Sequence, residues 1–188
     1  EHCPADSWFR AFMAIDATIQ ARHGSHRLPG KVIRPILGKP MMELQIERIR
    51  QSRLIDRVII ATTDKPQDDP IADLAFKLGC PCFRGSEEDV LGRVVGALEI
   101  YQVDIHVEFQ GDNPIPDPLL VDSIIGYYLK NEAIFDYVTN GLKTTYPPGL
   151  EVSVYPAQVL IDAEARAGGS VLREHVGLHI YQSPERYR

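Results

Sequence analysis

The sequence lacks the features of several specialised protein classes. Its three cysteines, Cys3, Cys80 and Cys82, provide no disulfide framework. Cys80 and Cys82 are spaced like half of a metal site, but no second Cys or His pair follows at metal-ligand spacing. We therefore interpret Cys80 and Cys82 as small apolar residues at the start of a strand rather than as metal ligands. No stretch reaches the roughly 18–20 apolar residues of a membrane span, and no signal-peptide pattern is present. We therefore expect a cytoplasmic protein with no membrane partner.

Positive charge is also scarce. The chain has 20 Lys and Arg against 26 Asp and Glu, a net charge of −6. A surface that binds nucleic acid needs a broad excess of cations, so we expect no nucleic-acid partner, and any anion site must be local. The 44% hydrophobic and 24% charged residues are typical of a soluble globular protein. The length of 188 residues suits one domain rather than two.

Short apolar runs alternate with segments of helical periodicity from Met13 onward. Strands are predicted over residues 12–20, 56–64, 80–85, 104–112, 135–140 and 149–156. Helices are predicted over residues 39–55, 69–79, 86–101, 117–131 and 157–168. Pro40 lies in the first turn of its helix, Gly79 closes another, and Ser86 with Asp89 resembles a capping box. This order predicts a mostly parallel sheet with helices on both faces.

Ligands of such sheets bind beyond the carboxyl ends of the strands. The polar segments at those ends are residues 22–31, 62–64, 110–113 and Asn140. The first has two glycines, Gly24 and Gly30, that allow close backbone approach. Three cations, Arg22, Arg27 and Lys31, are spaced so that a curled loop turns them toward a phosphate chain. It is not a Walker A motif, because the glycine spacing differs and no Ser or Thr follows the lysine. A basic solvated turn explains the segment about equally well.

A second candidate is the turn "FQGDNP", residues 109–114. Asp112 follows a strand and a glycine, where the ligand crevice of the sheet is expected. A carboxylate beside a polyphosphate site commonly holds Mg²⁺, which takes only one or two protein carboxylates. A plain Gly-Asp-Asn-Pro turn is the alternative. The combination of cations after the first strand and a carboxylate after a later one favours the ligand site.

Six stretches together resemble the sugar-acid cytidylyltransferases, the family of CMP-sialic-acid and CMP-KDO synthetases, and within it the spore-coat polysaccharide branch. They are "ARHGSHRLPGKVIRPILGKPM", "ATTDKPQDDPIADLA", "FRGSEEDVLGR", "FQGDNPIPDP", "TYPPGLEVSVYP" and "REHVGLHIY". The resemblance runs from about Ala14 to Arg188. It implies a three-layer α/β/α fold with a Rossmann-like sheet of the nucleotide-diphospho-sugar transferase type.

The resemblance also implies roles for individual residues. The catalytic set is Arg22, Lys31 and the magnesium ligand Asp112. The nucleotide-binding set is Ala21, Arg22, Gly24, Ser25, Arg27, Lys31, Arg93 and Gln110, of which Arg93 is the weaker match. The sugar-binding set is Tyr146, Glu151, Arg173, Glu174 and His175. For His175, a helix-start histidine satisfied by Glu174 is an equally good interpretation.

The reaction that the resemblance implies is transfer of CMP from CTP to a sugar acid, with Mg²⁺ as cofactor and pyrophosphate as the second product, for surface polysaccharide or glycoconjugate synthesis. We also expect a homodimer, by analogy with related synthetases. Two alternatives remain open. One is a nucleotide-sugar-dependent glycosyltransferase of similar fold, and the other is a non-catalytic nucleotide-binding domain.

Two departures from the family pattern affect these expectations. His26 stands where the branch usually has a threonine. Relatives continue beyond the position of Arg188 with a strand and a helix that carry a second metal carboxylate. We therefore expect a single nucleotidyltransferase domain over residues 13–188 without that strand and helix, and an extension of unknown role over residues 1–12.

Overall fold

The computed structural model describes residues 13–24, 28–143 and 145–188. Within them, the main sheet has six strands in the order β5-β4-β1-β6-β8-β7. The strands are β1 (Ile15–Gln20), β4 (Arg57–Thr63), β5 (Cys82–Gly85), β6 (Ile105–Gln110), β7 (Val138–Thr139) and β8 (Ser153–Pro156). β1 pairs in parallel with β4 and β6, and β4 with β5, whereas β8 is antiparallel to β6 and β7. The mostly parallel sheet predicted from the sequence is confirmed.

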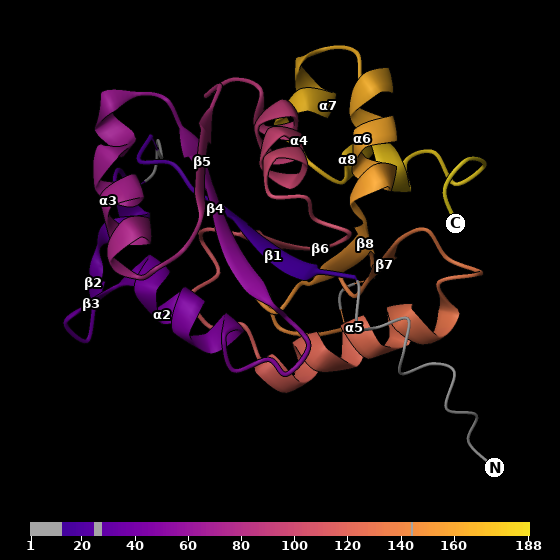
Figure 1. The fold of residues 1–188 in the computed structure, drawn as a ribbon, viewed down its shortest axis with the longest axis horizontal. Helices are drawn as coiled ribbons and strands as arrows, with labels where there is room; N and C mark the ends of the chain where they lie inside the picture. The colour runs from indigo at the N-terminus through magenta and orange to yellow at the C-terminus, as the bar shows by residue number, and fades with distance from the viewer. Residues whose placement is uncertain (1–12, 25–27, 144) are drawn as a thin grey trace.

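The helices lie on both faces of this sheet (Figure 1). They are α2 (Met41–Ile49), α3 (Asp69–Lys77), α4 (Val90–Ile100), α5 (Pro118–Asn131), α6 (Ala157–Arg166), α7 (Ser170–Glu174) and α8 (Leu178–Tyr181). Short 3₁₀ turns η1 (Lys31–Ile33) and η2 (Pro66–Asp68) and a hairpin of β2 (Pro35–Ile36) and β3 (Lys39–Pro40) complete the list. None of the helices in the described ranges is long and apolar enough to cross a membrane.

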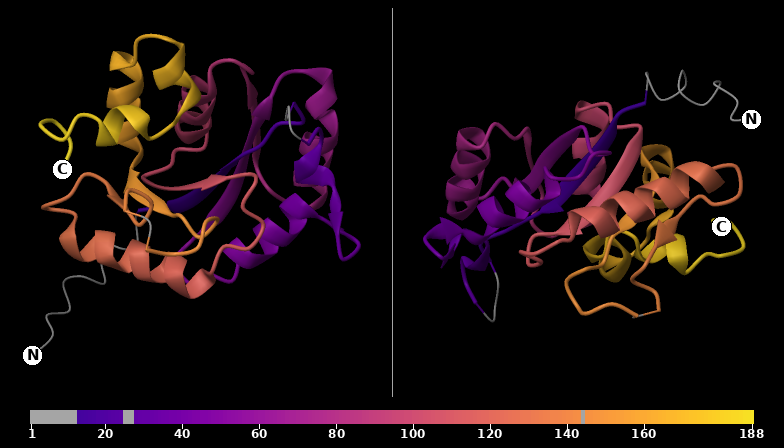
Figure 2. Two further views of the ribbon diagram at one scale, coloured as in Figure 1. Left: turned by 180° about the vertical axis from the view of Figure 1, so that it is seen from behind. Right: turned by 90° about the horizontal axis from the view of Figure 1, so that it is seen from below.

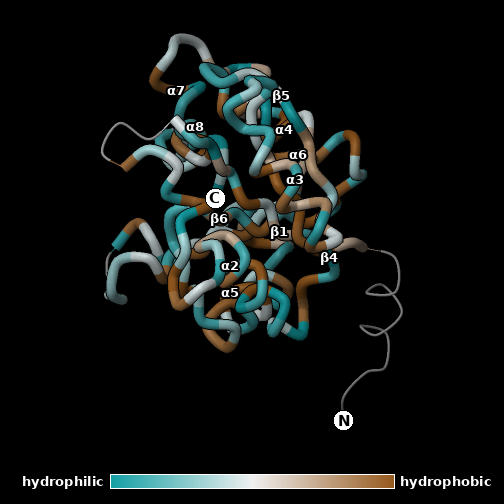
Figure 3. Tube along the Cα trace, turned by 90° about the vertical axis from the view of Figure 1, so that its left-hand side faces the viewer, coloured by the Kyte–Doolittle hydropathy of each residue, from teal (hydrophilic) through white to brown (hydrophobic). Residues whose placement is uncertain are grey.

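Two hydrophobic clusters, one on each face, hold the three layers together. On one face the buried side chains of α2, α3 and α5 pack against the sheet, and on the other those of α4, α6 and α8 do so. Figure 2 shows the two groups of helices on opposite sides of the strands, and Figure 3 shows hydrophobic segments gathered around β1 and β6 at the centre. The predicted three-layer α/β/α architecture is therefore confirmed.

The two central strands, β1 and β6, are apolar on one face and polar on the other. Successive side chains of a strand alternate between faces. The apolar set packs with α2 and α5, and consists of Ile15, Ala17, Ile19, Ile105, Val107 and Phe109. The polar set faces the α4 side, and consists of Asp16, Thr18, Gln20, His106, Glu108 and Gln110. This polar row forms a floor beneath the α4 layer.

Several element boundaries differ from the sequence prediction. The helix expected over residues 39–55 is the shorter α2, and Pro40, expected in its first turn, lies in β3 before the helix begins. The helix expected from Ser86 begins at Val90, and its N-cap is Asp89, whose carboxylate accepts a hydrogen bond from the Gly92 backbone N–H at 2.9 Å. The Ser86 hydroxyl instead accepts from the Glu88 and Asp89 backbone N–H groups. The prediction of a Ser86 N-cap is therefore wrong, because a local turn precedes the helix. The short helices α7 and α8 were not predicted.

A buried histidine in the polar row gives the fold a pH dependence. His106 is fully buried, its Nε2 lies 2.7 Å from the Thr18 hydroxyl, and Nδ1 has no partner among the described residues. Burial lowers the pKa of His106 from 6.5 to about 3. Between these values the unfolded chain takes up a proton that the folded chain does not, so stability falls as pH decreases below about 6.5, by about 1.4 kcal/mol per pH unit.

We predict that lowering the pH from 7 to 5 reduces the free energy of unfolding of the wild type by about 2 kcal/mol more than that of His106→Gln. Glutamine keeps a polar group near Thr18 and does not titrate. Urea denaturation at both pH values measures the difference. Equal losses in the two proteins would show that His106 is protonated in the folded state.

Candidate active site

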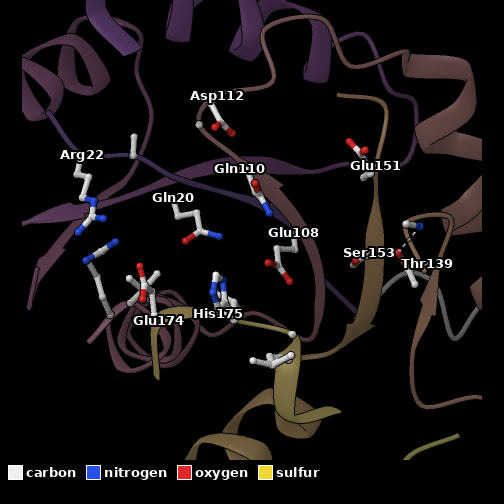
Figure 4. A pocket seen from close by; sticks show the side chains of 18 of the residues that line it. Gln20, Arg22, Glu108, Gln110, Asp112, Thr139, Glu151, Ser153, Glu174 and His175 are labelled. Carbon is white, nitrogen blue, oxygen red and sulfur yellow. Dashed lines mark hydrogen bonds between the residues drawn. The ribbon is translucent and has the colours of Figure 1, made fainter. Parts of the chain in front are cut away.

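A cavity of about 620 Å³ opens at the carboxyl ends of β1 and β6. The parallel register places Gln20 opposite Gln110 as the last residues of the two strands. Both line the cavity, and Figure 4 shows them on its floor. The loop after β1 and the turn after β6 therefore meet at one edge of the sheet, as predicted from the sequence.

Cationic side chains line one end of the cavity. Arg22, Lys31 and Arg93 contribute to its wall, together with Ala21 and Gly24. Arg93 is only 3% exposed; its Nη1 donates to the Ser86 carbonyl, and its Nε has no partner in the described ranges. Burial lowers the pKa of the Arg93 guanidinium, and the positive charge of Arg22 lowers it further. Two cations that repel each other beside a cavity favour a bound anion.

The turn after β6 positions Asp112 beside these cations. The Gly111 backbone N–H donates to the Gln20 carbonyl at 2.9 Å, and a Cβ added to Gly111 would lie 2.6 Å from that oxygen. Only glycine therefore fits this close approach of the two strand ends. Asp112 follows at the cavity rim and accepts a hydrogen bond from the Lys31 ammonium at 2.8 Å. Lys31 and Asp112, 81 residues apart, are thus a direct ion pair.

The loop after β1 is anchored by a buried carboxylate that the sequence analysis missed. Asp68, which has no exposed surface, accepts hydrogen bonds from the His23 backbone N–H at 2.6 Å and from the Thr63 hydroxyl. At the other end of the loop the Gly30 N–H donates to the His23 carbonyl, and Gly30 has a positive φ of 67°. These contacts hold the ends of the loop together at the cavity mouth. The predicted phosphate-binding residues Ser25 and Arg27 lie outside the described residues.

The opposite end of the cavity is lined by carboxylates and hydroxyls. Its wall includes Glu108, Tyr137, Thr139, Glu151 and Ser153. The Tyr137 and Ser153 hydroxyls are 2.9 Å apart, and the Ser153 hydroxyl donates to that of Thr139 at 3.0 Å. Of these residues, only Glu151 was predicted. Glu108 could have been predicted from the sequence, because it precedes Gln110 by two residues in the same strand and therefore lies on the same face of the sheet.

The predicted sugar-binding residues divide into two groups. Glu151, Glu174 and His175 line the cavity. Tyr146 and Arg173 are not among the residues that line it. Tyr146 is exposed on the loop between β7 and β8. The structure therefore does not bring Tyr146 and Arg173 to the site.

Arg173 instead joins three helices. Its Nη2 donates to Asp89 at the start of α4, at 2.5 Å, and to Glu164 in α6. These two carboxylates raise the pKa of the Arg173 guanidinium. The side chain therefore connects α7 to α4 and α6, which cover the sheet beside the cavity.

We predict that Arg173→Leu lowers the free energy of unfolding by about 1–3 kcal/mol, because two charge-assisted hydrogen bonds are lost. Binding of CTP, measured by calorimetry below the unfolding temperature, is expected to change less than threefold. A loss of CTP affinity of tenfold or more at unchanged stability would contradict the structural role and would show that Arg173 contributes to ligand binding.

Comparisons with known proteins agree with this geometry. A family model described as Cytidylyltransferase matches residues 17–188. The spore coat polysaccharide biosynthesis protein SpsF of Bacillus subtilis is 38% identical over 175 residues, which cover 90% of this chain and 71% of SpsF. A 3-deoxy-manno-octulosonate cytidylyltransferase of Trichlorobacter lovleyi is 29% identical over 90% of this chain and 76% of its own length.

A solved structure has nearly the same fold as this chain although its sequence identity is low. The cytidylyltransferase of Leptospira borgpetersenii serovar Hardjo-bovis superposes with a TM-score of 0.88 at 29% identity, covering 93% of this chain and 74% of the other. The chain, with its cationic loop and Gly-Asp turn at one edge of the sheet, belongs to the cytidylyltransferase family of nucleotidyltransferases.

Proposed function

We propose that this protein transfers a cytidylyl group from CTP to a hydroxyl of a sugar acid, for surface polysaccharide or glycoconjugate synthesis. The observation that carries the proposal is the meeting of Lys31, Arg22 and Arg93 with Asp112 at one end of a cavity. Such a set of cations suits a triphosphate. The opposite end, lined by carboxylates and hydroxyls, is left for the acceptor.

The reaction requires positioning and charge neutralisation more than covalent chemistry. The acceptor oxygen attacks the α-phosphorus in line, a new P–O bond forms, and the bond from the α-phosphorus to the bridging oxygen breaks. Pyrophosphate leaves with the bonding electrons, and the hydroxyl proton passes to water. Lys31, Arg22 and Arg93 neutralise the charge that develops on the pyrophosphate.

Asp112 fits a role as the protein ligand of Mg²⁺. It is partly exposed at the cavity rim beside the cations. The described part of the chain has no group of three or more His, Cys, Asp and Glu that could hold a metal, so Asp112, phosphate oxygens and water would complete the coordination. Mg²⁺ is commonly bound in this way. When bound, it would further neutralise the triphosphate.

We predict that Lys31→Ala and Asp112→Ala each lower kcat/KM for CTP by on the order of 10²-fold or more, because each removes charge stabilisation of the leaving group. Circular dichroism and the melting temperature are expected to stay close to wild type. The matched control is Lys39→Ala, since Lys39 lies on the β2–β3 hairpin, pairs with Glu47 and does not line the cavity. Near-wild-type turnover of either site variant would contradict the assignment.

The acceptor class is tested by pyrophosphate release from CTP, ATP, GTP and UTP. The acceptors are 3-deoxy-manno-octulosonate, its 8-amino-3,8-dideoxy analogue and N-acetylneuraminate. We expect release with CTP and Mg²⁺ and at least one of these acids, and none without an acceptor. Binding of CTP without release for every acid would instead support a non-catalytic nucleotide-binding domain.

A further inference from the structure

Glu108 is a carboxylic acid in the floor of the cavity, and no described residue forms an ion pair with it. It lies on β6 in the polar row of the sheet, two residues before Gln110. Figure 4 shows its side chain between Gln110 and His175, directed into the cavity, with Arg22 on the far side of the view. Glu108 therefore belongs to the half of the cavity that lacks the phosphate-binding cations.

The contacts of Glu108 fix one carboxylate oxygen and leave the other for a ligand. The Tyr155 hydroxyl donates to Oε2 at 2.7 Å. This hydrogen bond fixes the position of Oε2, because Tyr155 is itself fully buried. Oε1 has no hydrogen-bond partner in the described ranges. A preorganised acceptor atom with a free lone pair faces the cavity.

The charge of Glu108 is not balanced by the surrounding side chains. Among the described residues it forms no ion pair: of the cations that line the cavity, Lys31 pairs with Asp112, and neither Arg22 nor Arg93 forms an ion pair with Glu108. His175 lines the same cavity but is exposed, and in the described part of the chain no hydrogen bond or ion pair joins it to Glu108. Burial raises the pKa of the Glu108 carboxyl. An unpaired, half-buried carboxylate is costly until a cation reaches it.

We propose that Glu108 selects the acceptor by binding a positively charged amino substituent, so that the substrate is an amino-bearing sugar acid. The inference rests on the proposed function and names its acceptor class. An ammonium group donates hydrogen bonds to Oε1 and compensates the charge, whereas a hydroxyl donates without compensating it. The carboxylate of the acceptor then lies away from Glu108 and Glu151, toward the cationic end.

The test compares two acceptors that differ at one carbon, 3-deoxy-manno-octulosonate and 8-amino-3,8-dideoxy-manno-octulosonate. We expect the wild type to use the amino acceptor with a kcat/KM at least tenfold higher. In Glu108→Gln the preference is expected to fall to about twofold or less, through a higher KM for the amino acceptor. Glutamine retains the oxygen that accepts from Tyr155, so the fold and CTP affinity should be unchanged.

The control is Glu99→Gln, an exposed carboxylate of α4 that does not line the cavity, which should keep the amino preference. Equal use of the two acceptors, preference for the hydroxyl form, or an amino preference that survives Glu108→Gln would each overturn the role of Glu108. If no acid of the panel supports pyrophosphate release, the proposed function fails and the inference fails with it. The two failures are thus distinguishable.

Discussion

The parallel pairing of β1 with β6 is the constraint on which the site depends. Its register ends both strands at the same level, at Gln20 and Gln110, and the bond from Gly111 to the Gln20 carbonyl holds the two chain exits together. This contact brings the loop that carries Lys31 next to the turn that carries Asp112, so that the two side chains can form their ion pair. The alternation of β1 and β6 then assigns one face to the hydrophobic core and the other to the cavity floor.

The two ends of the cavity carry side chains of opposite charge. At one end the charge of Arg22 lowers the pKa of the Arg93 guanidinium, and within the described ranges neither arginine forms an ion pair with a carboxylate. At the other end Glu108 lies among tyrosine and serine hydroxyls. An anionic donor and an acceptor with a hydrogen-bond-donating or cationic group would therefore bind in one orientation. Electrostatic complementarity of this kind contributes to specificity more than to raw affinity.

The sequence predicted the sheet, its flanking helices and the meeting of Lys31 with Asp112, because these follow from periodicity and from the rule that ligands bind at strand ends. It could not predict the N-cap at Asp89, since Ser86 and Asp89 are both good caps and the choice depends on the turn between them. The ion pairs of Arg173 with Asp89 and Glu164 join residues distant in sequence. No local pattern indicates such a contact.

The central claim is that one cavity binds the triphosphate at its cationic end and the acceptor over Glu108. The most direct measurement is a crystal structure of the chain with CTP, Mg²⁺ and a non-reacting acceptor analogue. We expect the phosphates to contact Lys31, Arg22 and Arg93, the metal to contact Asp112, and the acceptor to lie against Glu108. A nucleotide bound outside this cavity, or with its phosphates at the Glu108 end, would contradict the account.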